Sequence, residues 1–152
     1  MAGYVCTIAG GKGGVGKTTT AINLAAALEG DHDTVVVDAD LGMANLAEML
    51  RLEYDRSLHE ILAGDATVSD GLTDAQGGVT TIPGEQSLEA FAEADPAKLK
   101  KVIKTLRNAY DVVFVDTGAG LSHETTVPLG LADGVILVTT PDHVAVSDSV
   151  KT

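Results

Sequence analysis

The sequence predicts an α/β fold, in which helices cover both faces of a doubly wound, mostly parallel sheet. Three observations support this prediction. Short runs rich in valine and isoleucine show little alternation with polar residues, helical patterns separate these runs, and a glycine-rich loop joins the first run to the first helical pattern. Strands that are apolar on both sides need cover on both sides, so we expect a three-layer sandwich.

The expected strands are the continuous apolar runs, because strands buried on both faces lack polar alternation. In chain order they are Tyr4–Ala9, Thr34–Val37, the weaker Val79–Ile82, Val112–Val115 and Val135–Thr140. The polar residues of Thr73–Gly78 predict a surface loop.

The expected helices combine apolar residues at helical spacing with residues that favour helix ends. They are Thr18–Glu29, Ala44–Leu50, Ser57–Ala63, a helix from Pro96 to about Ala109 that Asp95 caps, and the opening of a helix in Val144–Lys151. Residues 1–152 are therefore interpreted as one domain. The sequence leaves open whether this domain is truncated at its carboxyl terminus or unusually short.

The composition restricts the location and the partners of the chain. With 22 acidic and 10 basic residues the formal charge is -12, which disfavours nonspecific binding to DNA. Such a charge fits a salt-adapted cytoplasm, as in a halophilic archaeon, where salt screens self-repulsion. Cys6 is the only cysteine and no segment resembles a signal peptide or a membrane span, so a cytoplasmic protein is predicted.

The glycine-rich loop carries the clearest functional motif. Residues 11–18 read Gly-Lys-Gly-Gly-Val-Gly-Lys-Thr, which matches the P-loop pattern G-x-x-x-x-G-K-[ST] between a strand and a helix. Backbone N–H groups of such a loop surround phosphates, the lysine reaches the β- and γ-phosphates, and the threonine hydroxyl binds Mg²⁺. We therefore predict an ATP and Mg²⁺ site formed by Gly11, Lys12, Gly13, Gly14, Val15, Gly16, Lys17, Thr18 and Thr19.

Carboxylates follow two other expected strands. Asp38 and Asp116 each end an apolar run, and parallel strands bring such ends to one edge of the sheet. We predict that both carboxylates join Thr18 in the metal site, with Asp116 as the Walker B residue. A helix cap or a turn residue is the alternative for either aspartate. Asp40 is predicted to orient or deprotonate the attacking water.

The motifs together resemble the MinD/ParA family of ATPases. Lys12–Thr19 is similar to the deviant Walker A motif of that family, x-K-G-G-x-G-K-T-T, in which the additional lysine is Lys12. Residues 38–46 are similar to switch I of the family, and residues 111–120 to its Walker B motif and switch II. The MinD branch, in its archaeal forms, is the most similar. One departure is Gly118, which stands where the family usually has proline.

The resemblance implies a P-loop ATPase that acts as a dimerisation switch and positions a division site or another cellular assembly. In an ATP-dependent homodimer Lys12 reaches the partner's nucleotide. Together with Lys17 of the P-loop and Asp40, Lys12 is an expected catalytic residue. A protein activator or cargo adaptor is expected, and the resemblance allows peripheral attachment at the inner face of the cell membrane, although no targeting helix is found in this chain. Two alternatives stay open: a ParA-like DNA-partitioning ATPase, and an adaptor that binds ATP without hydrolysing it.

Overall fold

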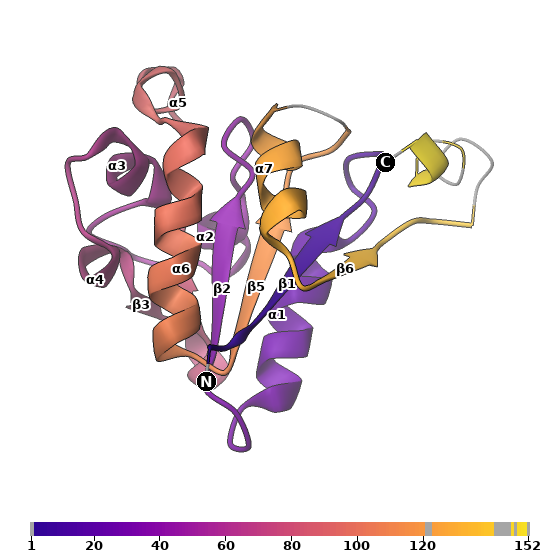
Figure 1. The fold of residues 1–152 in the computed structure, drawn as a ribbon, viewed down its shortest axis with the longest axis horizontal. Helices are drawn as coiled ribbons and strands as arrows, with labels where there is room; N and C mark the ends of the chain where they lie inside the picture. The colour runs from indigo at the N-terminus through magenta and orange to yellow at the C-terminus, as the bar shows by residue number, and fades with distance from the viewer. Residues whose placement is uncertain (1, 121–122, 142–146, 148, 152) are drawn as a thin grey trace.

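The computed structural model describes residues 2–120, 123–141, 147 and 149–151. Within these residues the sheet has six strands in the order β3-β4-β2-β5-β1-β6 (Figure 1). The strands are β1 (Tyr4–Ala9), β2 (Thr34–Ala39), β3 (Thr73–Asp74), β4 (Thr80–Ile82), β5 (Val112–Thr117) and β6 (Gly134–Leu137). All neighbours are parallel except β3 and β4. The predicted fold class is confirmed.

The valine-rich strands are buried because their side chains alternate between two helical layers. On β2, Val36 packs with Ala21 and Ala25 of helix α1 (Lys17–Leu28) on one face. Val35 and Val37 face the other layer, which contains α3 (Leu58–Ala63), α6 (Leu99–Ala109) and α7 (His123–Leu131). Figure 1 shows α6 running alongside β2. Both faces are covered, as the apolar runs predicted.

Several boundaries differ from the predictions. Strands β2 and β5 each continue two residues further than expected, so Asp38 and Asp116 lie inside the strands. The expected loop at residues 73–78 is wrong in part, since β3 pairs there with β4 before the 3₁₀ helix η1 (Gln76–Gly78). A two-residue strand is too short to show a period in sequence.

Other differences concern helices. The expected helix from Pro96 begins as the 3₁₀ helix η2 (Pro96–Lys98) before α6, and the expected helix at 44–50 is only α2 (Leu46–Met49). The short helices α4 (Val68–Gly71) and α5 (Leu88–Glu93) and helix α7 were not predicted. Most of Val144–Lys151 lies outside the described residues. In the part of the chain that is described, no helix is both long enough and apolar enough to cross a membrane.

The sheet register brings the candidate site together. Asp38 of β2 is the direct neighbour of Asp116 of β5, and Asp116 is also the neighbour of Ile8 of β1. The loop that follows β1 therefore begins next to Asp116, one strand away from Asp38, at the carboxyl end of the parallel strands.

Candidate functional site

The loop between β1 and α1 has the backbone conformation that its glycines permit. Gly14 and Gly16 have φ angles of 72° and 103°, in the left-handed region that favours glycine. Helix α1 begins at Lys17 with no side-chain cap and no acidic residue in its first turn. Its first N–H groups are therefore available to a ligand, and the positive end of the helix dipole favours an anion there.

The loop forms one wall of a cleft of about 530 Å³. The cleft is lined by Gly13, Gly14, Gly16, Lys17, Thr18, Thr19, Asp40, Leu41, Gly42, Met43, Asn45, Met49, Phe91, Thr117, Gly118 and Ala119. The structure thus brings most of the predicted loop residues and Asp40 into one cavity. Lys17 is nearly buried, and its ammonium donates to the carbonyl of Lys12 at 3.1 Å, whereas Lys12 itself is exposed.

Thr18 and Asp116 are in direct contact at the base of the cleft. The Thr18 hydroxyl lies within hydrogen-bond distance of Asp116 Oδ2 and 3.0 Å from Asn45 Oδ1. Asp116 is 1% exposed, and its Oδ1 is buried without a hydrogen-bond partner. A buried carboxylate oxygen without a partner, next to a hydroxyl, is a donor set that fits Mg²⁺.

Asp38 is fully buried and anchors the segment that follows β2. Its Oδ2 accepts hydrogen bonds from the N–H groups of Asn45 and Leu46, at 3.1 and 3.0 Å, and its Oδ1 accepts one from Asp40 at 3.3 Å. Asp38 therefore holds the first turn of α2, which is the structural alternative considered above. Its place in the metal site stays a prediction. No group of three or more acidic, histidine or cysteine side chains among the described residues could hold a metal ion alone.

Burial dominates the electrostatics of these carboxylates. Burial, followed by the neighbouring charge of Asp116, raises the pKa of Asp38 to about 7. Burial also raises the pKa of Asp116 to about 6, although the hydrogen bond from Thr18 and the charge of Lys17 act in the opposite direction. Two adjacent carboxylates with raised pKa values favour a cation beside them.

Asp40 belongs to the loop after β2 and lies at the edge of the cleft, where it faces the loop after β5. Its Oδ1 accepts a hydrogen bond from the N–H of Met43 at 3.1 Å. A β-carbon placed on Gly118 would lie 3.0 Å from the same oxygen, so Gly118 permits this close approach. The sequence interpretation did not assign site roles to Met49, Phe91 and Thr117. Phe91 belongs to α5, which no sequence pattern had indicated.

Comparisons with known proteins agree on one relationship. Residues 3–149 match a family model described as AAA domain. An uncharacterised ATP-binding protein of Methanocaldococcus jannaschii is 40% identical over 146 residues, which are 95% of this chain and 55% of that protein. The chain spans little more than half the length of the curated relatives it matches.

Two solved structures are similar throughout the chain. The cell division ATPase MinD of Pyrococcus furiosus has a TM-score of 0.91 and 38% identity, over 98% of this chain and 64% of that chain. The septum site-determining protein MinD of Pyrococcus horikoshii, complexed with Mg-ADP, has a TM-score of 0.90 and 38% identity, over 97% of this chain and 62% of that chain.

Proposed function

The chain belongs to the AAA domain family and, within it, to the MinD/ParA group of ATPases, and from this premise we propose that it binds and hydrolyses Mg-ATP as a dimerisation switch. The observation that carries the proposal is the contact between Thr18 and Asp116 at the base of a cleft whose wall is a glycine-rich loop.

The loop and the helix that follows it are proposed to hold the nucleotide. N–H groups of residues 13–18 would donate to phosphate oxygens, and the Lys17 ammonium would exchange the Lys12 carbonyl for a phosphate. Thr18 and Asp116 would hold Mg²⁺, with Asp38 close behind them. When bound, this ion supplies positive charge that offsets the charge of the phosphates.

Asp40 and Lys12 are the proposed catalytic side chains, with Lys17. The Asp40 carboxylate lines the cleft and is the best placed base to orient or deprotonate a water. Lys12 is exposed, as required of a lysine that reaches a nucleotide held by a second copy. Its ammonium would stabilise charge that develops during phosphoryl transfer.

The proposed biological use is the positioning of a division site or another assembly in the cytoplasm, at the inner face of the cell membrane. The names of the two MinD structures, which refer to cell division and to septum site determination, support this use. The nucleotide cycle would make a surface available to a protein activator or cargo adaptor in one state only.

One experiment tests the switch against its alternatives. ATP hydrolysis and oligomeric state are measured for the wild type, Lys12→Ala and Asp40→Ala, with and without liposomes and DNA, and Lys100→Ala is the control for an exposed lysine. The switch predicts an ATP-trapped dimer for Asp40→Ala and loss of the dimer for Lys12→Ala. Binding to DNA only with ATP would favour a partitioning ATPase, and ATP binding without turnover would favour an adaptor. Absence of Mg²⁺-dependent affinity for ATP or ADP would refute all three.

A further inference from the structure

An apolar groove lies beside the cleft, between helix α5 and the segment that follows β2. Its volume is about 590 Å³, and it is lined by Gly42, Met43, Asn45, Glu48, Gln86, Ser87, Leu88 and Phe91. Leu88 is 89% exposed, Met43 is 77% exposed and Phe91 is 39% exposed. Single exposed apolar residues are common, but three around one groove mark an interaction surface. We call this surface the α5 groove.

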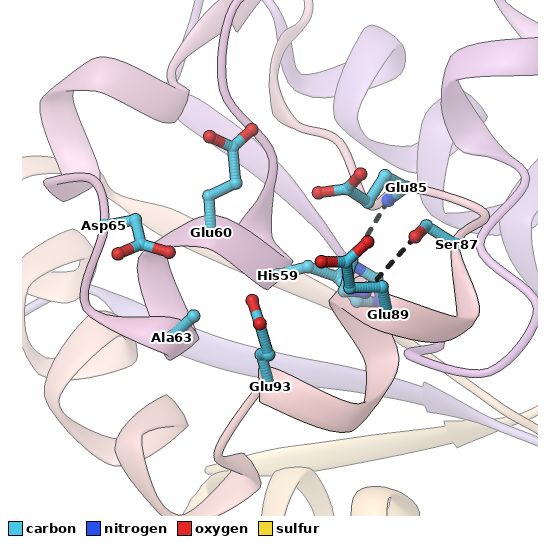
Figure 2. A pocket seen from close by; sticks show the side chains of 9 residues that line it. His59, Glu60, Ala63, Asp65, Glu85, Ser87, Glu89 and Glu93 are labelled. Atoms are coloured by element: carbon cyan, nitrogen blue, oxygen red, sulfur yellow. Dashed lines mark hydrogen bonds between the residues drawn. The ribbon is translucent and has the colours of Figure 1, made fainter.

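An acidic hollow lies on the other side of α5 (Figure 2). Its carboxylates come from α3, the segment after α3, the loop before α5 and α5 itself, and Figure 2 shows them surrounding the hollow: Glu60, Asp65, Glu85, Glu89 and Glu93. Glu60 pairs with Arg56 at 2.6 Å, and Glu85 accepts a hydrogen bond from the Ser57 hydroxyl at 2.7 Å. Among the described residues no ion pair engages the other three carboxylates.

The acidic hollow and the α5 groove meet at Ser87. Ser87 lines both, and Glu48 stands on the opposite wall of the groove. The groove therefore has an apolar centre and carboxylates on both sides. Such a surface complements apolar side chains that are flanked by positive charges.

The α5 groove shares a wall with the nucleotide cleft. Met43 and Phe91 line both cavities, and the N–H of Met43 donates to Asp40. Gln86 crosses the groove, because its amide donates to the carbonyl of Ala44 at 2.7 Å and to Glu48 at 3.2 Å. A ligand in the groove therefore contacts the same segment that carries Asp40.

His59 ties this segment to the acidic hollow. The ring is fully buried, its Nε2 lies 2.7 Å from the carbonyl of Leu41, and its Nδ1 accepts a hydrogen bond from the N–H of Glu85 at 3.1 Å. Because Nδ1 accepts, the proton is on Nε2, which donates to Leu41. One buried ring therefore bridges the loop at Glu85 and the segment after β2.

We propose that the α5 groove binds an amphipathic segment of a partner protein, with apolar side chains in the groove and lysine or arginine side chains toward the carboxylates. A second copy of this chain is disfavoured as the occupant of the groove itself, because a symmetric contact through the groove would bring the two acidic rims together. An anionic membrane is repelled for the same reason. The inference rests on the proposed function only for its effect on the nucleotide.

The test uses a fluorescent helical peptide that has leucines at helical spacing flanked by lysines, and a comparison peptide with glutamates in place of the lysines. Fluorescence anisotropy is expected to show saturable binding of the lysine peptide to the nucleotide-free chain. Leu88→Ser and the double variant Glu89→Lys/Glu93→Lys are each expected to weaken it at least about tenfold.

Matched controls separate the groove from general charge attraction. Val150→Ser removes an apolar side chain that is 82% exposed elsewhere, and Glu29→Lys/Asp31→Lys reverses two charges near the other end of the sheet. Both controls are expected to bind the peptide as the wild type does. Equal losses in the controls and the groove variants would overturn the proposal, as would equal binding of the glutamate peptide.

Other occupants give different results. Self-association that Leu88→Ser abolishes would assign the groove to a second copy, and wild-type binding to phosphatidylglycerol vesicles that the same variant loses would assign it to a membrane. Either result would overturn the proposal. The affinity for Mg-ADP is measured on the same samples. Peptide binding without Mg-ADP binding would support the proposed peptide site in the α5 groove and would refute the proposed ATPase function.

The shared wall predicts coupling between the two sites. Mg-ADP is expected to change the affinity for the lysine peptide about fivefold, and the peptide must then change the affinity for Mg-ADP by the same factor. An unchanged peptide affinity in a protein that binds Mg-ADP would overturn the coupling. Leu88 does not line the nucleotide cleft, so Leu88→Ser is expected to keep the wild-type affinity for Mg-ADP.

Discussion

Asp38→Asn is expected to remove the Asp38 contribution to the pH dependence of stability in the nucleotide-free protein and to leave the smaller contribution of Asp116. Asp38 is fully buried beside Asp116, and both carboxylates have raised pKa values. A carboxyl group with a raised pKa in the folded state stabilises the fold when it is protonated. That stability is fully present below the ordinary pKa of 3.8, and it is lost as the pH rises through about 7.

The magnitude follows from the pKa change. The pKa of Asp38 rises from 3.8 to about 7, and each pKa unit corresponds to about 1.36 kcal/mol, so the wild type should lose about 4 kcal/mol between these pH values. Asparagine keeps an oxygen for the N–H groups of Asn45 and Leu46 but cannot accept from Asp40, a bond of 3.3 Å. That loss costs about 1 kcal/mol. The variant should therefore be slightly less stable than the wild type at about pH 4 and about 3 kcal/mol more stable at about pH 8.

Urea unfolding in the presence of a chelator measures both effects. The control is Asp31→Asn, which removes the same charge from an exposed position and should follow the wild-type pH profile. Molar salt screens surface repulsion but not a buried pair, so the difference between the two variants should persist in salt. A wild-type stability that does not fall between pH 5 and pH 8, or a parallel fall in Asp38→Asn, would refute the reasoning.

Three further perturbations have defined outcomes. His59→Leu leaves the carbonyl of Leu41 and the N–H of Glu85 without their partner, so urea unfolding should show a loss of about 2–4 kcal/mol, and a change under about 0.5 kcal/mol would contradict the bridge. Gly118→Ala places a methyl group 3.0 Å from Asp40 Oδ1, so steady-state ATP turnover should fall about tenfold while Mg-ADP affinity stays the same. The charge of -12 predicts a melting temperature that rises with added NaCl, and a flat salt profile would exclude the halophilic interpretation.

The sheet could be predicted because its signal is local. The runs 35–37 and 112–115 are apolar at every position, since successive side chains enter different helical layers. Helix α7 was missed because it contains Pro128 and lacks a one-sided apolar pattern. Helices α4 and α5 are too short for a helical period to be visible, although Thr67 and Ser87 cap their first turns.

The candidate site was predictable to the extent that it is a motif. Glycines 14 and 16 and the following lysine and threonine lie within residues 14–18, so their spacing indicates a phosphate loop without knowledge of tertiary contacts. The α5 groove depends on Phe91 and Gln86 meeting a segment more than 40 residues earlier in the chain, as in the bond from Gln86 to Ala44, which spans 42 positions. Only the folded arrangement reveals such a contact.

The segment after β2 is held by contacts that a ligand can compete for. Asp38 holds its N–H groups at Asn45 and Leu46, and the side-chain oxygen of Asn45 lies 3.0 Å from the Thr18 hydroxyl, which also contacts Asp116. Any ligand that takes the Thr18 hydroxyl competes with Asn45 for it, which weakens one of the contacts that fix the segment. Movement of that segment would alter both walls that it provides, one facing the cleft and one facing the α5 groove. The geometry therefore offers a short physical route from the phosphate loop to a partner surface, with Thr18 and Asn45 as its first step.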